Sequence, residues 1–378
     1  MLVISLASGA SYFKTPGVAA QRAIEAIETN AISYGETEGM AALREAVVEK
    51  YTQLNIKDLL PDQVLVTSGV KQALYNLLQN LLRTPEDEVI LPIPSWFGFQ
   101  ELMRYSKGKL VPLHTRLEDN FALTPQMLQQ VITKNTRLLL LTNPNNPTGR
   151  TYTLQELEAL FQVLEKYPEV LVICDEIYDQ VAFGKQVPTA LASQYLKNRI
   201  IVVNGISKSF AMSGWRVGYM VGPLNIIQAC TDFQQATISG VSTVLQEAAL
   251  AALQQADAVL QPMQAVLEAN RTLMINSLKQ LTEVRLMEPE GSYYIFADFS
   301  AYLNHTSPEG TEIKSGTDLW EYLKQKAKVE VQPGENFGAP GFARLSFAVE
   351  PDRLLQALQQ LSSCLTQLKP LEVTNSRF

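Results

Sequence analysis

Two basic residues, Lys208 and Arg216, follow an aliphatic run at residues 200–203. A lysine that comes directly after a buried strand is costly unless it is used or paired. Its amine can form a Schiff base with a carbonyl group, and the planar guanidinium of Arg216 can hold a phosphate. Schiff-base chemistry beside a phosphate is that of a pyridoxal phosphate enzyme. Taken alone, each residue fits a surface position as well.

A carboxylate and a tyrosine, Asp175 and Tyr178, follow a second apolar run at residues 170–173. The carboxylate can keep a pyridine nitrogen protonated, so that the ring acts as an electron sink, and the tyrosine can reach the ring's phenolic oxygen. Asn146, in the proline-rich turn 143–149, adds a neutral donor. The spacing Asp-x-x-Tyr is common by chance, and the turn also fits a rigid loop that only reverses the chain.

A glycine-containing stretch, Ser68-Gly69-Val70-Lys71, leads into a leucine-rich helical pattern. Glycine lets the backbone approach a ligand closely, and free N–H groups at a helix start attract an anion, so we expect a phosphate here. Trp96 follows the next apolar run and offers a flat face for stacking on an aromatic ring, although it also fits a core position.

The elements that position these residues are short apolar runs at 64–67, 88–91, 138–141, 170–173 and 200–203. Most lack polar alternation, which is typical of strands covered on both faces of a parallel sheet. Helical spacing of leucines at 74–82 and 154–164 separates them, which indicates an α/β fold. Because ligands bind outside the carboxyl ends of such strands, we expect the polar groups after each run to converge at one edge.

The composition narrows the class of protein. The 378 residues are 46% hydrophobic and 18% charged, which suits a large core and excludes a disordered chain. The net charge of −7 and the lack of a basic stripe predict no nucleic acid or anionic membrane as partner. Three distant cysteines and two histidines predict no disulfide framework and no metal site. No apolar run approaches the roughly 20 residues that span a bilayer, and no signal peptide is indicated, so we expect a cytoplasmic protein.

These motifs resemble, in order along almost the whole chain, the fold-type I pyridoxal phosphate aminotransferases of class I/II, in their aspartate-aminotransferase-like branch. The resemblance rests on Asn-Pro-x-Asn-Pro-Thr-Gly at 143–149, Asp-Glu-x-Tyr at 175–178 and Ser-Lys-(x7)-Arg at 207–216. Further matches lie at 6–9, 15–16, 34–35, 39–44, 333–338 and 344–346. The resemblance implies a large cofactor-binding domain at 30–265, with a mostly parallel seven-stranded sheet flanked by helices. It also implies a smaller α+β domain at 1–29 and 266–378.

The resemblance also implies a role for each matched residue. Lys208 corresponds to the Schiff-base lysine that also shuttles the substrate proton, Asp175 to the partner of the pyridine nitrogen, and Trp96 to the stacking ring. Tyr178 and Asn146 correspond to the pair that bonds the ring oxygen. The implied phosphate-binding group consists of Gly69, Val70, Lys71, Ser207 and Arg216, joined by Tyr34 from a neighbouring subunit. Arg344, Gly9 and Asn146 are the implied contacts of the substrate.

The function expected from the resemblance is transfer of an amino group from an L-amino acid to a 2-oxo acid such as 2-oxoglutarate, by a homodimer with shared active sites. A carbon–sulfur β-lyase or a cyclase of the same fold begins with the same proton abstraction, so the motifs leave it open. A regulator that binds the cofactor without turnover is a further alternative, against which the lack of a basic patch argues. The family's N-terminal arm has no counterpart before Leu6, so we expect dimer contacts and active-site closure to differ.

Overall fold

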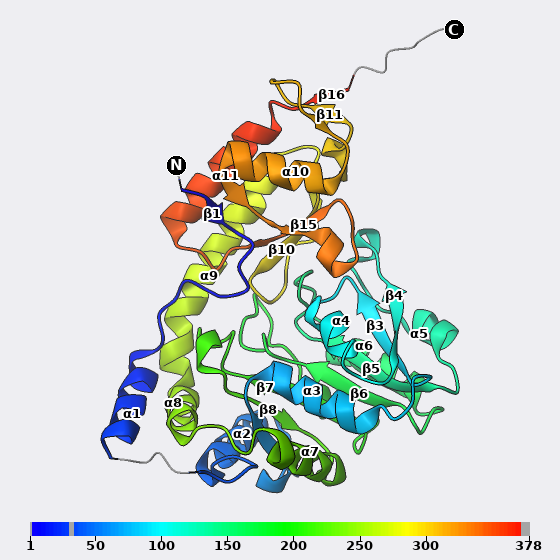
Figure 1. The fold of residues 1–378 in the computed structure, drawn as a ribbon, viewed down its shortest axis with the longest axis vertical. Coiled ribbons are helices and arrows are strands. Elements are labelled where there is room, and N and C mark those ends of the chain that lie inside the picture. The colour runs from blue at the N-terminus through cyan, green and yellow to red at the C-terminus, as the bar shows by residue number, and fades with distance from the viewer. Residues whose placement is uncertain (1, 30–33, 372–378) are drawn as a thin grey trace.

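The computed structural model describes residues 2–29 and 34–371, and the lower part of Figure 1 is built on a seven-stranded sheet. The strand order is β2-β8-β7-β6-β5-β3-β4. The strands are β2 (Val64–Thr67), β3 (Glu88–Ile93), β4 (Lys109–His114), β5 (Thr136–Thr142), β6 (Leu171–Asp175), β7 (Ile200–Gly205) and β8 (Gly218–Val221). Strands β4, β3, β5, β6 and β7 pair in parallel, whereas β8 is antiparallel to β7 and to β2. The predicted α/β fold with a mostly parallel sheet is confirmed.

The five apolar runs of the sequence all lie in strands of this sheet, and two strands were not predicted. Every residue of β2, β3 and β7 is buried, which explains the lack of alternation. Strand β4 lies at the sheet edge with most side chains partly exposed, so its apolar signal is weak. Strand β8 has four residues and begins at Gly218, where a Cβ would collide with the backbone of Gly69 and Val70.

Helices cover both faces of the sheet because alternate strand residues point to opposite sides. Leu138 and Leu140 of β5 pack with α3 (Val70–Leu81), α4 (Gly98–Met103) and α7 (Leu224–Thr237). Leu139 and Leu141 pack on the other side with α2 (Ala41–Gln53), α5 (Pro125–Val131) and α6 (Leu154–Leu164). Helices therefore fix the sheet from both sides, and the loops at the carboxyl ends of its parallel strands are where a ligand is expected to bind.

The helical stretch at 243–279 consists of two helices, α8 (Thr243–Gln254) and α9 (Ala256–Lys279). Gln255 between them leaves the helical conformation at φ −115° and ψ 32°. Helix α1 (Gly17–Glu28) packs on α8, while α9 extends to the upper part of Figure 1.

The upper part has the α+β character expected from the sequence. Its antiparallel sheet has the order β14-β15-β10-β9 and consists of β14 (Gln332–Pro333), β15 (Phe342–Ser346), β10 (Tyr294–Asp298) and β9 (Arg285–Leu286). Helices α10 (Gly316–Tyr322) and α11 (Pro351–Leu365) accompany it. Smaller pairings join β1 (Ile4–Ser5) to β13 (Val329–Glu330), and β11 (His305–Thr306) to β12 (Glu312–Ile313) and β16 (Lys369–Pro370).

The N-terminal segment connects the two parts, because β1 pairs with β13 whereas α1 packs on α8. The boundaries 30–265 and 266–378 stay a prediction. Among residues 2–29 and 34–371, no helix is long and apolar enough to cross a membrane.

Candidate active site

A cavity of about 490 Å³ opens where the parallel strands end and the C-terminal sheet faces them. The sequence-predicted residues in its lining are Gly9, Val70, Lys71, Trp96, Asn146, Asp175, Tyr178, Ser207, Lys208, Arg216 and Arg344. They come from the N-terminal segment, from the loops after five strands of the large sheet, and from β15. Residues from both ends of the chain therefore meet at one edge of the sheet.

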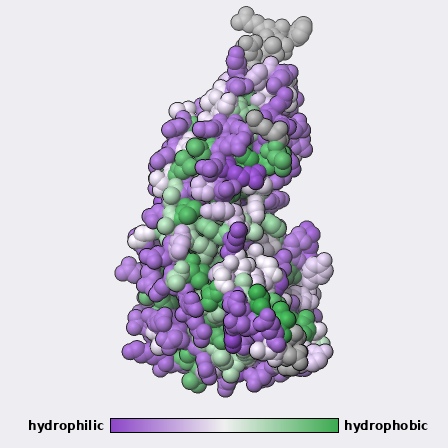
Figure 2. All heavy atoms as spheres, turned by 90° about the vertical axis from the view of Figure 1, so that its left-hand side faces the viewer, coloured by the Kyte–Doolittle hydropathy of each residue, from purple (hydrophilic) through white to green (hydrophobic). Residues whose placement is uncertain are grey.

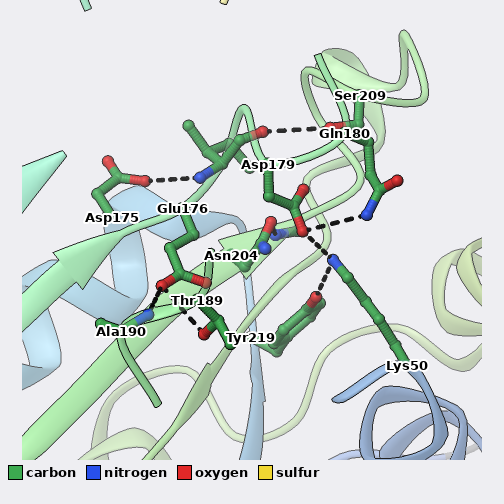
Figure 3. A network of polar contacts seen from close by, with 12 residues as sticks. Lys50, Asp175, Glu176, Asp179, Gln180, Thr189, Ala190, Asn204, Ser209 and Tyr219 are labelled. Carbon is green, nitrogen blue, oxygen red and sulfur yellow. Dashed lines mark hydrogen bonds and ion pairs between the residues drawn. The ribbon is translucent and has the colours of Figure 1, made fainter. Parts of the chain in front are cut away.

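The Asp175 carboxylate lies at the end of β6 and is 5% exposed. Its Oδ1 accepts a hydrogen bond from the backbone N–H of Ile177 at 3.1 Å, as Figure 3 shows. Burial raises the pKa of Asp175 to about 7, although the Ile177 N–H and the charge of Lys208 both act to lower it. The carboxylate is therefore short of positive charge, and a cationic N–H group in the cavity would stabilise its ionised form.

The Lys208 amine points into the cavity and donates a hydrogen bond to the carbonyl oxygen of Gly9 at 2.5 Å. The hydroxyl of Tyr293 donates to the same oxygen at 2.9 Å. Gly9 thus holds the amine close to the C-terminal sheet. A Cβ at Gly9 would lie 3.8 Å from Nζ of Lys208, which is an ordinary van der Waals contact.

The start of α3 and Arg216 together form a site suited to an anion. Gly69 precedes α3 with φ 78°, a left-handed conformation that favours glycine, and a Cβ there would collide with the guanidinium of Arg216. Arg216 donates to the backbone carbonyl of Ser213 at 2.8 Å. The free N–H groups of the first helical turn and the guanidinium then face the same space. Gly69 itself lies just behind the cavity lining.

Arg344 of β15 is 3% exposed and reaches across to the large sheet. It donates to Oδ1 of Asn146 at 2.9 Å and to the carbonyl oxygen of Ala7 at 2.8 Å. Its guanidinium lies 4.1 Å from the ring centroid of Tyr294. The buried Nε atom has no hydrogen-bond partner within the described part of the chain. A planar carboxylate fits this group, because the guanidinium presents parallel donors.

The sequence reasoning missed Tyr294, whose hydroxyl lies 3.0 Å from that of Tyr178. Burial, followed by the neighbouring Tyr294 and Tyr293, raises the pKa of Tyr178 well above its usual value, so its hydroxyl stays protonated and can donate. The other missed lining residues are Ala7, Phe97, Thr142, Ile177, Ser213 and Gln332. Thr142 ends β5, and the expectation of polar groups at strand ends could have found it. No spacing in the sequence points to Tyr294 or Gln332, which tertiary packing brings to the cavity.

Behind the 175–178 segment lies a second group of charges. Glu176 is 1% exposed and accepts hydrogen bonds from the Ala190 N–H at 2.7 Å and the Thr189 hydroxyl at 3.1 Å. Burial raises the pKa of Glu176 to about 8, and the neighbouring Asp179 charge adds to the rise. Asp179 pairs with Lys50, as Figure 3 shows. Burial alone lowers the pKa of Lys50, but the Asp179 charge and Tyr219 raise it overall, so the amine stays charged.

Tyr34 is not in the cavity lining of its own chain and is 98% exposed. A core position in its own subunit is therefore excluded. Within residues 2–29 and 34–371, no cluster of three or more histidine, cysteine or acidic side chains could hold a metal ion.

Comparison with known proteins shows that this chain is similar to one family over nearly its whole length. Residues 2–361 match the family described as aminotransferase class I and II. An aspartate/prephenate aminotransferase of Nitrosomonas europaea is 33% identical over 96% of this chain and 92% of its own length.

The fold has close neighbours among solved structures. The aspartate aminotransferase of Rhizobium meliloti superposes with a TM-score of 0.93 at 33% identity, over 97% of this chain and 92% of its own. An aromatic aminotransferase of Pyrococcus horikoshii gives 0.89 at 29% identity, over 96% of both chains.

The raised pKa of Glu176 predicts a pH dependence of stability. An unfolded glutamate loses its proton near 4.5 and the folded one near 8, so the unfolded state holds fewer protons in that window. The free energy of unfolding should therefore fall as pH rises through this range. Glu176→Gln removes this titration, so its urea unfolding in the cofactor-free form should depend less on pH than the wild type. The exposed Glu101→Gln is the control, and identical pH curves for Glu176→Gln and wild type would contradict the assignment.

Proposed function

The chain belongs to the aminotransferase class I and II family, and we propose that it transfers the amino group of L-aspartate to a 2-oxo acid such as 2-oxoglutarate. The family is that of fold-type I enzymes that use pyridoxal 5′-phosphate. The observation that carries the proposal is the convergence of Lys208, Asp175 and Arg344 on one cavity. These residues supply an amine, a buried carboxylate and a carboxylate-binding guanidinium in one enclosed space.

The residues of the cavity fit each chemical part of the cofactor. The Asp175 carboxylate, short of positive charge, suits a protonated pyridine nitrogen. The cradle that a Cβ at Gly69 would fill, together with Ser207 and Arg216, suits the phosphate. Lys71 and Val70 add charge and backbone N–H groups beside it, and Trp96 supplies a flat ring. When bound, the cofactor supplies an electron sink that weakens the bond between the substrate Cα and its hydrogen.

The residues of the chain then have separate tasks. Arg344 binds the substrate α-carboxylate, with Asn146 and the Gly9 region beside it, and so directs the Cα–H bond toward Lys208. The Lys208 amine accepts the proton from Cα. Asp175 remains ionised and holds a positive N–H group in place. Tyr178, whose raised pKa keeps its hydroxyl protonated, donates a hydrogen bond within the cavity.

The choice of aspartate is supported by the relatives rather than by the shape of the fold. The Nitrosomonas europaea protein is named for aspartate and prephenate. Among the solved structures, the Rhizobium meliloti protein is named an aspartate aminotransferase, whereas the Pyrococcus horikoshii protein, with a nearly equal TM-score, is named an aromatic aminotransferase. Fold similarity therefore does not separate donors, and the higher sequence identity favours a dicarboxylic donor. No observation favours the β-lyase or cyclase alternatives.

We also propose that the protein works as a homodimer with shared sites, in the cytoplasm as the sequence predicts. The face that carries α1 displays hydrophobic side chains among hydrophilic ones, as Figure 2 shows. Ile24 and Ile27 of α1 are 49% and 54% exposed, and Tyr34 is almost fully exposed. A two-fold partner on this face would cover these side chains, and its Tyr34 would be available to the phosphate site.

The proposed donor is tested with a panel of L-amino acids and two acceptors, 2-oxoglutarate and prephenate. We expect kcat/KM for aspartate to exceed that for alanine by about 10-fold or more, because a distal carboxylate adds a charge-assisted interaction. Lys208→Ala should show no transfer with any donor. Keto acid that forms without any amino acceptor would favour the lyase alternative, and a preference for an aromatic donor would overturn the choice of aspartate.

The shared site predicts complementation between two damaged chains. Tyr34→Phe on one chain and Lys208→Ala on its partner leave one site of the heterodimer with both defects and one with neither. Coexpression should therefore restore activity relative to both substitutions in one chain, provided that Tyr34→Phe alone is clearly impaired. The readout is the amino-transfer rate of purified heterodimer. If Tyr34 serves its own subunit instead, no site is intact and no activity returns.

A further inference from the structure

The segment after β6 presents its side chains to two different sides. Asp175 and Tyr178 line the cavity, whereas Glu176 and Asp179 point behind it toward Ala190 and Lys50, as Figure 3 shows. A backbone hydrogen bond from the Asp179 N–H to the Glu176 carbonyl at 2.9 Å closes the segment into a turn. Asp175 is thus fixed by the sheet, whereas Tyr178 lies in a turn whose polar side-chain contacts lie outside the cavity.

Lys50 connects this turn to two distant parts of the chain. It comes from α2, its amine lies 2.5 Å from Oδ2 of Asp179, and it donates to the Tyr219 hydroxyl of β8 at 3.1 Å. The side chains of Lys50 and Asp179 are 15% and 10% exposed. Helix α2, the turn after β6 and strand β8, which lies two strands from β6 in the sheet, therefore meet at a single amine that is largely shielded from water.

The importance of a shielded ion pair such as Lys50–Asp179 shows mainly in the cost of removing one of its two members. Loss of one member leaves an uncompensated charge in a desolvated place, which the protein relieves by opening the structure to water. Oδ1 of Asp179 already lacks a hydrogen-bond partner among the described residues, so Lys50 is the main compensation for this carboxylate. Without Lys50, the carboxylate would have to move toward solvent, and Tyr178 is joined to it by a peptide bond.

The other contacts of the turn do not replace the ion pair between Lys50 and Asp179. Glu176 is held through Thr189 and Ala190 at the first residue of the turn. Gln264 donates to the carbonyl of Gln180 at 2.8 Å, one residue beyond Asp179. Among the contacts that the structure describes, the side chain of Asp179, the residue after Tyr178, has one strong contact, which is its ion pair with Lys50.

We propose that Lys50 is a positioning residue for amino transfer, which acts through its ion pair with Asp179 to hold Tyr178 at the cavity. The proposal rests on the proposed role of Tyr178. Lys50 itself does not line the cavity and touches neither substrate nor cofactor site.

The test compares Lys50→Met, Asp179→Asn and the double variant with wild type. Lys279→Met is the matched control, because Lys279 forms an exposed ion pair with Glu288 away from the cavity. Four quantities are measured on each purified protein: the melting temperature, kcat and KM for aspartate, the dissociation constant of the cofactor from the cofactor-free protein, and the pH at which the visible absorbance of the bound cofactor changes.

For Lys50→Met we expect kcat to fall roughly 10- to 100-fold, as a small displacement of reacting groups produces. KM should change little, because Arg344 is untouched. The cofactor dissociation constant should rise about 10-fold, as weakening one charge-assisted hydrogen bond gives, and the pH of the absorbance change should shift. The double variant should recover part of both losses, because it leaves no buried charge unpaired. Lys279→Met should match the wild type in all four.

A purely structural role gives a different result. If Lys50→Met lowers the melting temperature but leaves kcat, cofactor affinity and the absorbance titration unchanged, the proposal is overturned. If Lys50→Met does not fold, the double variant and Asp179→Asn test the proposal through the same measurements of kcat, cofactor affinity and the absorbance titration. If the wild type binds the cofactor but does not use aspartate, the proposed donor is contradicted. The cofactor dissociation constants of Lys50→Met and wild type would still test the proposed role of Lys50.

Discussion

A carboxylate kept out of water at the end of a central strand is the constraint on which the site depends. Asp175 cannot move toward solvent, because β6 is paired on both sides and the helices cover both faces of the sheet. Its ionised form is stabilised by the Ile177 N–H and by the charge of Lys208, which together do not offset burial. The protein therefore holds a strained electrostatic arrangement that a cationic ring nitrogen would relieve.

Other elements of the chain contribute the remaining charged and polar groups of the cavity around Asp175. The helix start after Gly69 and Arg216 on the neighbouring loop define where an anion sits relative to Asp175. Arg344 comes from the C-terminal sheet and lines the same cavity as Lys208. In the proposed mechanism, the edge of the large sheet holds the cofactor and the C-terminal sheet holds the substrate, so that the relative placement of the two sheets sets the geometry of proton transfer.

Much of this could be predicted from the sequence, because strands buried on both faces give uninterrupted apolar runs with polar groups at their ends. The edge strand β4 and the short β8 escaped this pattern, since partial exposure and a leading glycine remove the signal. Tyr294 and Gln332 could not be predicted, because neither belongs to a motif, whereas Arg344 of the same sheet was reached through the family resemblance. Lys50 has no sequence signal either, since a lysine in a helix is ordinarily a solvent-exposed charge.

The central claim is that the buried Asp175 carboxylate becomes fully ionised when a cationic group binds beside it. The ionisation of Asp175 can be measured directly. Carboxyl carbon shifts from aspartate-labelled protein, assigned by their loss in Asp175→Asn, report the pKa with and without cofactor. We predict a pKa of about 7 in the cofactor-free protein and ionisation throughout the neutral range once pyridoxal 5′-phosphate is bound. An ordinary aspartate pKa in the cofactor-free protein, or a pKa that binding leaves unchanged, would contradict the account.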